Sequence, residues 1–146
     1  MIVLDSNVVS ALMRLESEPA IAAWLTQQKI DDLWTTSPTV FEIRFGIEAK
    51  PQGRRRRVLE EAFQDVLTNL LGRRVVEFDL AAAEAAGRAR AVHKRRGVAV
   101  SIPDSQIAGI ALDRGVPIAT RDVDGFGHLG ITLVNPWSSG ALKSRI

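Results

Sequence analysis

Four acidic residues stand at positions that a parallel sheet wrapped by helices would bring together. Asp5 follows a short apolar run at the start of the chain, and Asp122 follows a similar run near its end. Asp104 lies in the first turn of a helix that a proline opens, and Glu42 lies one turn into an earlier helix. Strand ends and the helix starts after them share one edge of a parallel sheet, so we expect Asp5, Asp104 and Asp122 to converge there. Glu42 joins them if its helix crosses that edge.

Carboxylates gathered in one cleft repel one another unless a cation neutralises them. The chain has no cysteine, and its two histidines, His93 and His128, lie outside these motifs, where we expect structural or exposed roles. Hard oxygen ligands without sulfur or imidazole suit Mg²⁺ or Mn²⁺. Such an ion turns one of its waters into a usable nucleophile and stabilises charge on a phosphoryl oxygen. The four acids therefore predict a metal-assisted attack on phosphorus.

Each acid also has an ordinary structural explanation. Asp5 could cap the first helix, and Asp104 could complete a capping box with Ser101 three residues earlier. Asp122 could form an Asx-turn, and Glu42 could lie on the solvated face of its helix. Taken singly, the structural explanation is favoured for each residue. Taken together, their predicted convergence at one sheet edge favours a cation site.

The elements that must position these acids alternate between short β-branched strands and amphipathic helices. Strands are predicted at 2–4, 33–36, 75–78, 116–120 and 131–134. Helices are predicted at 6–14, 19–28, 37–49, 54–71, 79–96 and 103–114, with Ser37 and Asp79 as N-caps. Strands that alternate with helices are typical of an α/β fold with a mainly parallel sheet, here of about five short strands.

Composition narrows the class of protein. A chain of 146 residues fits one domain and needs no disulfide to fold. It has no run of about 18 apolar residues that could span a membrane, and no basic segment of a signal peptide before its first strand. We therefore expect a cytoplasmic protein. Most cations are arginines, including the run 54–57 at the start of a helix, where their charge opposes the helix dipole. This position of the run suggests a polyanionic partner, but a solvated basic surface is slightly favoured over a nucleic-acid contact.

Five stretches, in order and with suitable spacing, resemble one known family across nearly the whole chain. They are residues 2–10, 41–47, 102–108, 118–126 and 133–137. The chain is similar in these stretches to PIN-domain nucleases, and specifically to bacterial toxins of the VapC and FitB type. The resemblance implies a three-layer α/β/α PIN fold over residues 1–137, followed by a polar C-terminal tail at 138–146.

The resemblance also implies a metal-dependent ribonuclease that cleaves RNA phosphodiesters with a metal-activated water. Asp5, Glu42, Asp104 and Asp122 fall on the family's acidic cluster and would hold Mg²⁺ or Mn²⁺. Ser6 and Thr120 fall on small hydroxyl positions that support this cluster.

The fourth acid and the substrate contacts are less sharply fixed by the resemblance. Asp124 is a second candidate beside Asp122, and Gly125 replaces an acid that many relatives carry before the aromatic residue. Arg44, close to Glu42 on the same helix, is the nearest candidate to hold a phosphate of the RNA.

Relatives of this type form homodimers and toxin–antitoxin assemblies. The resemblance therefore implies a cognate antitoxin that inserts a segment into the active-site groove and carries its own DNA-binding domain. The alternative is a PIN-like module that binds an antitoxin or another partner without significant catalysis. A haloacid-dehalogenase-like phosphatase needs a second aspartate at the position of Asn7. A receiver domain needs an acidic pair where Ser6 stands, and its lysine after a late strand is missing, since Lys143 lies in the tail.

Overall fold

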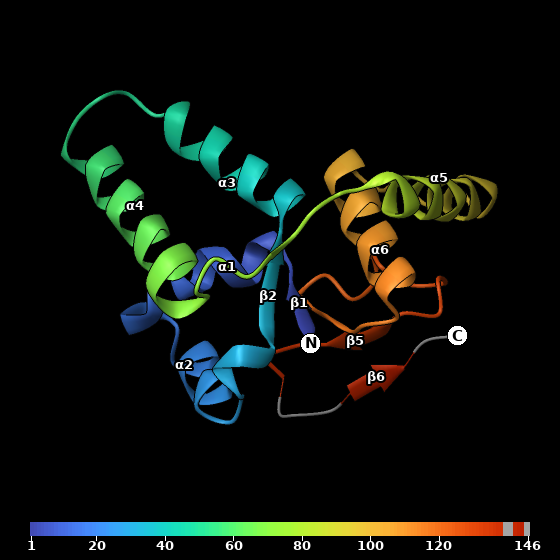
Figure 1. Cartoon of the computed structure of the whole chain (residues 1–146), viewed down its shortest axis with the longest axis horizontal. Helices are drawn as coiled ribbons and strands as arrows, with labels where there is room; N and C mark the ends of the chain where they lie inside the picture. The colour runs from blue at the N-terminus through green and yellow to red at the C-terminus, as the bar shows by residue number, and fades with distance from the viewer. Residues whose placement is uncertain (139–141, 145–146) are drawn as a thin grey trace.

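The computed structural model describes residues 1–138 and 142–144, and it confirms the predicted α/β fold (Figure 1). Its sheet has the strand order β3-β2-β1-β4-β5-β6, in which β1 to β5 are parallel and β6 is antiparallel to β5. The strands are β1 Ile2–Leu4, β2 Leu33–Thr36, β3 Val75–Val76, β4 Ile118–Ala119, β5 Thr132–Val134 and β6 Leu142–Ser144. All are short, so the hydrophobic contacts of the flanking helices must stabilise them.

Helices cover both faces of the sheet. They are α1 Ser6–Leu12, α2 Pro19–Thr26, α3 Ser37–Glu48, α4 Arg54–Gln64, α5 Leu80–Arg95 and α6 Ile102–Arg114. Two short 3₁₀ turns, Leu15–Ser17 and Ile30–Asp32, flank α2. In Figure 1, α1 to α4 lie on one side of β1 and β2, and α5 and α6 lie on the other. No helix of the described ranges is long and apolar enough to cross a membrane.

Alternation along the central strands divides the interior into two cores. Val3 belongs to the core beneath α5 and α6, whereas its neighbour Leu4 belongs to the core beneath α1 to α4, and neither is exposed. Ile118 and Ala119 in β4 divide in the same way. Successive side chains of a strand point to opposite faces, so a strand buried on both faces is apolar throughout. This is the three-layer arrangement that the sequence predicted.

The α5–α6 pair fixes where the acid of α6 stands. Both helices are rich in small residues, and they make the closest helix pair in the fold. A Cβ on Gly109 would lie 2.4 Å from the carbonyl oxygen of Ala82 and 2.6 Å from the Cβ of Ala86. Only glycine therefore allows α6 to approach α5 this closely, and that approach positions the N-terminal turn of α6 at the sheet edge.

Local predictions differ from the structure in four respects. The N-cap of α3 is Thr36, whose hydroxyl accepts from the Thr39 N–H at 3.2 Å, and not Ser37, which instead accepts from the Phe78 N–H. Two neighbouring hydroxyls could each cap, and sequence alone does not rank them. The predicted helix 54–71 continues beyond α4 as a π-helix, Asp65–Leu70. The predicted strands at 75–78 and 116–120 are shorter in the structure, at Val75–Val76 and Ile118–Ala119.

The fourth difference lies in the C-terminal tail. Part of the tail, Leu142–Ser144, pairs with β5, so the strand at 131–134 is not the last strand. A three-residue segment containing lysine and serine carries no strand pattern, and its pairing with the sheet edge is a tertiary effect. Residues 139–141 and 145–146 of the predicted tail lie outside the described residues. The predicted domain boundary at residue 137 stays a prediction.

Candidate active site at the carboxyl edge of the sheet

Asp5 is the centre of a group of polar side chains at the carboxyl ends of the strands. It follows β1 directly and is only 3% exposed. Its Oδ1 accepts a hydrogen bond from the Ser6 N–H at 2.7 Å, so Asp5 caps α1, as its structural explanation supposed. Its Oδ2 accepts from the Thr120 hydroxyl at 2.7 Å and from the Asn7 amide at 3.2 Å. Neutral donors therefore hold both oxygens.

The pKa of Asp5 is raised from 3.8 to about 6. The largest cause is burial, which disfavours the charged carboxylate, and the charges of Asp104 and Glu42 raise the pKa further. The hydrogen bonds from Thr120 and Ser6 act in the opposite direction. An acid whose pKa is raised by burial and by neighbouring acids is a candidate functional residue.

Glu42 reaches the same place from α3. The Ser6 hydroxyl donates to Glu42 Oε1 at 2.6 Å, and it lies 3.3 Å from the Thr39 hydroxyl. Ser6 follows Asp5 in the chain, so this one serine holds Glu42 beside Asp5 although 36 positions separate Ser6 from Glu42 in sequence. The expectation that α3 crosses the sheet edge is therefore met, and Glu42 is half-buried.

Asp104 stands in the first turn of α6, as predicted. The Ser101 hydroxyl accepts from the Asp104 N–H at 3.2 Å, which makes Ser101 the N-cap of α6. Burial is the largest cause that raises the pKa of Asp104, and the charges of Glu42 and Asp122 add to it. A hydrogen bond from the Ser101 side chain lowers this pKa. The electrostatic coupling joins Asp104 to acids on two other elements.

Asp122 lies beyond β4 and is tied to the same group through Thr120. Its backbone N–H donates to the Thr120 hydroxyl oxygen at 2.9 Å, while its Oδ1 accepts from the Gly125 N–H at 3.0 Å. The second bond comes from the N–H three residues on, one residue further than in the Asx-turn that was its structural explanation. The charge of Asp122 acts on Asp104, so Asp122 lies within electrostatic reach of the other acids.

The close approach of the Asp122 carboxylate explains why residue 125 is a glycine. A Cβ at this position would lie 2.4 Å from Asp122 Oδ2, so any larger residue would displace that carboxylate. Gly125 therefore allows the carboxylate position that Asp122 has here.

Asn7 is the site residue that the sequence reasoning missed. Its amide donates to Asp5 Oδ2, lies 3.4 Å from the Thr120 hydroxyl, and accepts at Oδ1 from the Arg121 N–H at 3.3 Å. It joins the start of α1 to the segment after β4. Its position two residues after Asp5 was the available signal, but Asn7 served there only to exclude a phosphatase.

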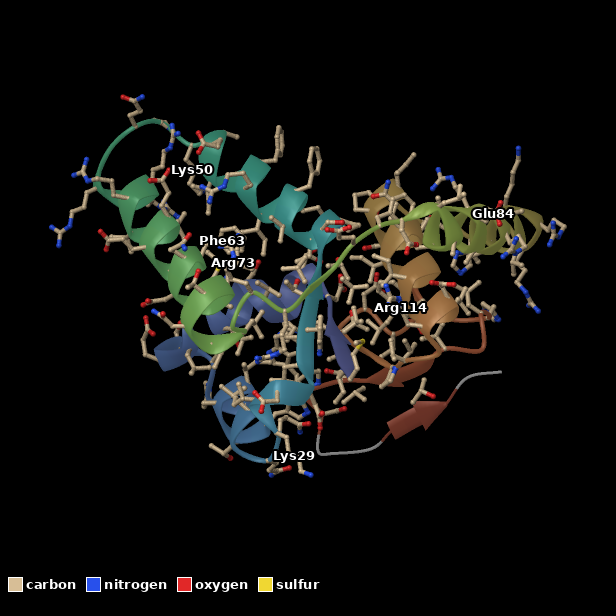
Figure 2. All side chains as sticks on the ribbon, viewed as in Figure 1. Lys29, Lys50, Phe63, Arg73, Glu84 and Arg114 are labelled. Carbon is tan, nitrogen blue, oxygen red and sulfur yellow. The ribbon has the colours of Figure 1, made fainter. Side chains whose placement is uncertain are left out.

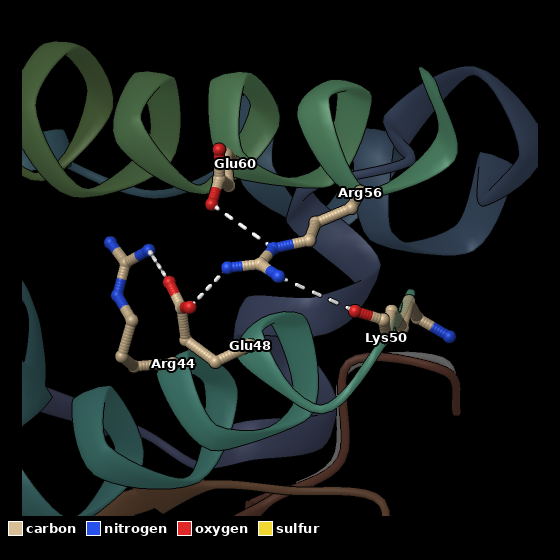
Figure 3. A network of polar contacts seen from close by, with 5 residues as sticks. All are labelled: Arg44, Glu48, Lys50, Arg56 and Glu60. Carbon is tan, nitrogen blue, oxygen red and sulfur yellow. Dashed lines mark hydrogen bonds and ion pairs between the residues drawn. The ribbon is translucent and has the colours of Figure 1, made fainter. Parts of the chain in front are cut away.

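Arg44 has intramolecular partners instead of facing the acids. Its guanidinium lies 3.6 Å from Glu48 on α3 and stands over the ring of Phe63, 5.4 Å from the centroid. Figure 3 shows Arg44 in a network with Glu48, Arg56 and Glu60 that joins α3 to α4, and Phe63 lies between these two helices in Figure 2. These contacts give Arg44 a structural role. Its role in holding RNA stays a prediction.

The two histidines have the roles that the sequence predicted. His93 is buried and its Nε2 lies 2.9 Å from the Gly127 carbonyl oxygen, so this nitrogen carries the proton and donates. His128 is exposed in the turn after Gly127. Neither is among the residues that contact the four acids.

The acids act on one another without forming a closed ligand shell. Among the described residues, no group of three or more His, Cys, Asp or Glu side chains is arranged to hold a metal ion. Within the same residues, none of the ion pairs includes Asp5, Glu42, Asp104 or Asp122. The arrangement therefore gathers negative charge at one edge and leaves it without a neutralising cation from those parts of the chain.

Comparison with known proteins agrees with this geometry. The PIN domain family matches residues 2–131. The chain belongs to the PIN-domain family. This PIN domain is 37% identical over 137 residues to the VapC ribonuclease Y4jK of Sinorhizobium fredii (strain NBRC 101917 / NGR234), covering 94% of the chain and 98% of that relative. It is 30% identical to toxin FitB of Neisseria gonorrhoeae (strain ATCC 700825 / FA 1090), covering 94% of the chain and 99% of FitB.

Solved structures place the PIN domain in the same group. The structure of FitAB bound to an IR36 DNA fragment matches with a TM-score of 0.85 at 29% identity, covering 97% of this chain and 99% of that chain. The predicted membership of the VapC and FitB type is thus confirmed for both sequence and fold.

Proposed function

We propose that this PIN domain is an endoribonuclease that depends on Mg²⁺ or Mn²⁺ and acts as the toxin of a bacterial toxin–antitoxin pair. The observation that carries the proposal is the set of unpaired acids around Asp5. A buried carboxylate with a pKa near 6, coupled to Asp104 and Glu42 on two helices, is costly to maintain without a function. The relatives named as a VapC ribonuclease and as toxin FitB supply the reaction class.

The residues fit a divalent cation in their chemistry. All the donors are carboxylate oxygens, which Mg²⁺ and Mn²⁺ prefer. Burial raises the pKa of Asp5 most and the charges of Asp104 and Glu42 add to it, and a cation would offset both effects. Asp5, Glu42 and Asp104 would hold it, with Asp122 as the fourth acid. When bound, the ion supplies a nucleophilic water and neutralises charge on a phosphoryl oxygen.

Neutral groups of this chain orient the carboxylates of the site. Thr120 and Asn7 fix Asp5 Oδ2, and the Ser6 N–H fixes Asp5 Oδ1, so the carboxylate has a defined orientation before any ligand arrives. The Ser6 hydroxyl fixes Glu42 in the same way. Such outer contacts orient the ligands of a metal and cost about 10- to 100-fold in affinity or activity when removed.

RNA and a DNA-binding antitoxin are the proposed partners, and the cytoplasm is the proposed place of action. FitB relatives occur in a FitAB assembly bound to DNA, which supports a protein partner that carries the DNA contact. We expect the antitoxin to insert a segment over the acids and the toxin to be a homodimer within a larger assembly.

One observation favours a second candidate, a PIN-like binding module without significant catalysis. The acids of the described residues are not arranged to hold an ion. A module of this kind would bind its antitoxin at the same edge and would neither cleave RNA nor gain stability from Mg²⁺.

The Asp5→Asn variant separates the two functions. The purified wild-type protein is expected to cleave single-stranded RNA with Mg²⁺ and to unfold at a higher temperature when Mg²⁺ is added. Asp5→Asn keeps the shape and the Thr120 contact but removes the charge, so both effects should disappear. Asp32→Asn, at an exposed acid of a 3₁₀ turn, is the matched control and should behave as wild type. Cleavage by Asp5→Asn at the wild-type rate would refute the assignment of the acids.

A further inference from the structure

The arginine run at the start of α4 divides into one paired residue and three unpaired ones. Arg56 contacts Glu48 on α3, lies 3.6 Å from Glu60, and donates to the Lys50 carbonyl at 3.5 Å (Figure 3). Within residues 1–138 and 142–144, the side chains of Arg54, Arg55 and Arg57 make no ion pair or hydrogen bond, and all three are exposed. The α3–α4 network therefore explains one arginine of four.

Helix geometry places the three unpaired arginines together. Successive residues are about 100° apart around a helix axis, so Arg54, Arg55 and Arg57 cover one side of α4, opposite Arg56. Because Arg56 points toward α3, this side faces solvent. We call it the arginine face. Val58, 54% exposed, and Glu61 lie on the same side.

The arginine face has no local electrostatic benefit. The last turn of α5 also carries cations, Lys94 and Arg95, but there the negative end of the helix dipole attracts positive charge. The start of α4 is the positive end of its helix, and Gly53 provides no side-chain cap there. Four adjacent cations at that end are unfavourable in the isolated chain. A polyanionic partner would make the electrostatic contribution of these cations favourable.

We propose that the arginine face binds backbone phosphates of the RNA substrate beyond the cleavage site, an inference that rests on the proposed ribonuclease function. The two sites are joined by α3, which carries Glu42 at the acids and Glu48 at Arg56. Six residues of helix span about 9 Å along the axis of α3, and the arginine face lies further on, on the side of α4 away from Arg56. An RNA strand bound at the acids must therefore continue around the start of α4 to reach it. Guanidinium groups match phosphate geometry, which gives this face the shape as well as the charge for RNA.

A protein partner fits the arginine face less well. The core of a protein interface is depleted in charge and enriched in apolar and aromatic side chains. Here three arginines surround a single exposed valine, and the large exposed aromatic residues, Phe41 and Phe45, lie on α3. The surface therefore resembles a phosphate-contact surface, in which scattered positive charges contribute most of the affinity.

The test combines the substitutions Arg54→Gln, Arg55→Gln and Arg57→Gln in one variant. Cleavage is measured with a short RNA that covers only the acids and with a longer RNA of the same cleavage sequence. For the longer RNA, KM should rise on the order of tenfold with little change in kcat. The slope of log affinity against log salt should become shallower by about 2, because three phosphate contacts on a single strand contribute about 0.7 each.

Two further variants keep the result interpretable. Arg54→Lys, Arg55→Lys and Arg57→Lys together retain the charge and should restore most of the salt dependence but only part of the affinity. Arg88→Gln, Arg95→Gln and Arg96→Gln together remove the same charge from exposed positions of α5 and its end and should leave the preference for long RNA intact. Thermal unfolding of the α4 variant should be unchanged or raised, since it removes cations from a helix N-terminus.

The outcomes separate this inference from the function on which it rests. If the wild type cleaves neither RNA with Mg²⁺, the proposed function fails. If it cleaves both and the α4 variant keeps the wild-type KM for long RNA, the arginine face does not bind RNA. An equal loss in the α5 variant would show a general charge effect and would also overturn the inference. The inference would also be overturned if the only defect of the α4 variant were a loss of antitoxin binding. The same holds if its only defect were a loss of binding to random double-stranded DNA.

Discussion

Carboxylates cluster in two regions of this molecule, and their partners differ. In the α3–α4 hairpin, Glu48 and Glu60 are partly exposed and contact arginines, chiefly Arg56. At the sheet edge, Asp5 is buried, and its hydrogen-bond donors are a hydroxyl, an amide and a backbone N–H. In the hairpin, arginines of the same chain neutralise the carboxylates. At the sheet edge, neutral groups hold the carboxylate in place. A cluster of the first kind joins two helices, and one of the second kind is suited to an added cation.

The energies of the two clusters should differ as well. Exposed ion pairs contribute little to stability, because water screens them and long side chains lose entropy when they pair. Buried acids without a cation reduce stability, and they do so more as they ionise. The comparison therefore predicts that changes at the edge alter function and pH dependence strongly, whereas changes in the hairpin alter both weakly.

The pH dependence of stability gives the largest expected difference. Asp5 has a pKa of about 6 in the folded protein and 3.8 ordinarily, so the folded state binds this proton more tightly than the unfolded chain. Its contribution is fully present below pH 3.8 and is lost as pH rises through 6, which amounts to about 3 kcal/mol. Asp104 acts in the same direction.

Thermal unfolding without divalent ions between pH 4 and 7 measures this effect. Wild type should lose stability relative to Asp5→Asn as the pH rises, and the difference between the two isolates Asp5 from all other groups. Glu18, whose pKa is lowered by the Trp137 indole, contributes in the opposite direction to both proteins and cancels. Added Mg²⁺ should stabilise the wild type at pH 7 and not at pH 4. Parallel curves for the two proteins would contradict the burial of an uncompensated acid.

Removing the Thr120 hydroxyl should have the next largest effect. Thr120→Val keeps the shape but removes the bond to Asp5 Oδ2 at 2.7 Å and the acceptor of the Asp122 N–H. We expect a 10- to 100-fold loss in Mg²⁺ affinity or cleavage, measured by titrating Mg²⁺ at a fixed RNA concentration. Thr26→Val, on the exposed end of α2, is the control. Full activity with unchanged Mg²⁺ dependence would mean that Thr120 only joins the strands.

A methyl group at Gly125 should produce a smaller, several-fold loss. The added Cβ would lie 2.4 Å from Asp122 Oδ2 and would push this carboxylate aside, while Asp5, Glu42 and Asp104 keep their contacts. Gly125→Ala therefore tests whether Asp122 is the fourth acid. The expected signature is a lower Mg²⁺ affinity that Asp122→Asn reproduces and that Asp124→Asn does not. A loss with Asp124→Asn alone would assign the fourth position to Asp124.

The sequence could predict the acids at this sheet edge because each of them follows from a pattern of neighbouring residues. An apolar strand that ends at Asp5, a proline-opened helix with Asp104, and a strand before Asp122 place three acids without any tertiary information. What the sequence could not provide were contacts between distant segments. Asn7 bonding across to Arg121, Ser6 bonding to Glu42, and the pairing of Leu142–Ser144 with β5 each depend on the assembled fold.

Arg44 is a second case in which the sequence could not predict the contacts of a side chain. On the sequence it is a cation two residues from Glu42, which suggests a phosphate contact. Residues two apart on a helix point in different directions, so proximity to Glu42 in sequence does not by itself decide which way Arg44 points. The structure turns Arg44 to Glu48 and Phe63 and leaves the unpaired arginines one helix further along.

The hairpin network should give the smallest effect. Glu48→Gln removes the charge that pairs with Arg56 and Arg44, but both glutamate and arginines are partly exposed, and Arg56 keeps Glu60 and the Lys50 carbonyl. We expect a loss of less than about 1 kcal/mol in unfolding free energy and no change in cleavage of a short RNA. Chemical denaturation in low and high salt measures it, and the small loss should vanish in high salt. A loss as large as that at the sheet edge would show that the network, like Asp5, is held away from water, and the contrast between the two clusters would fail.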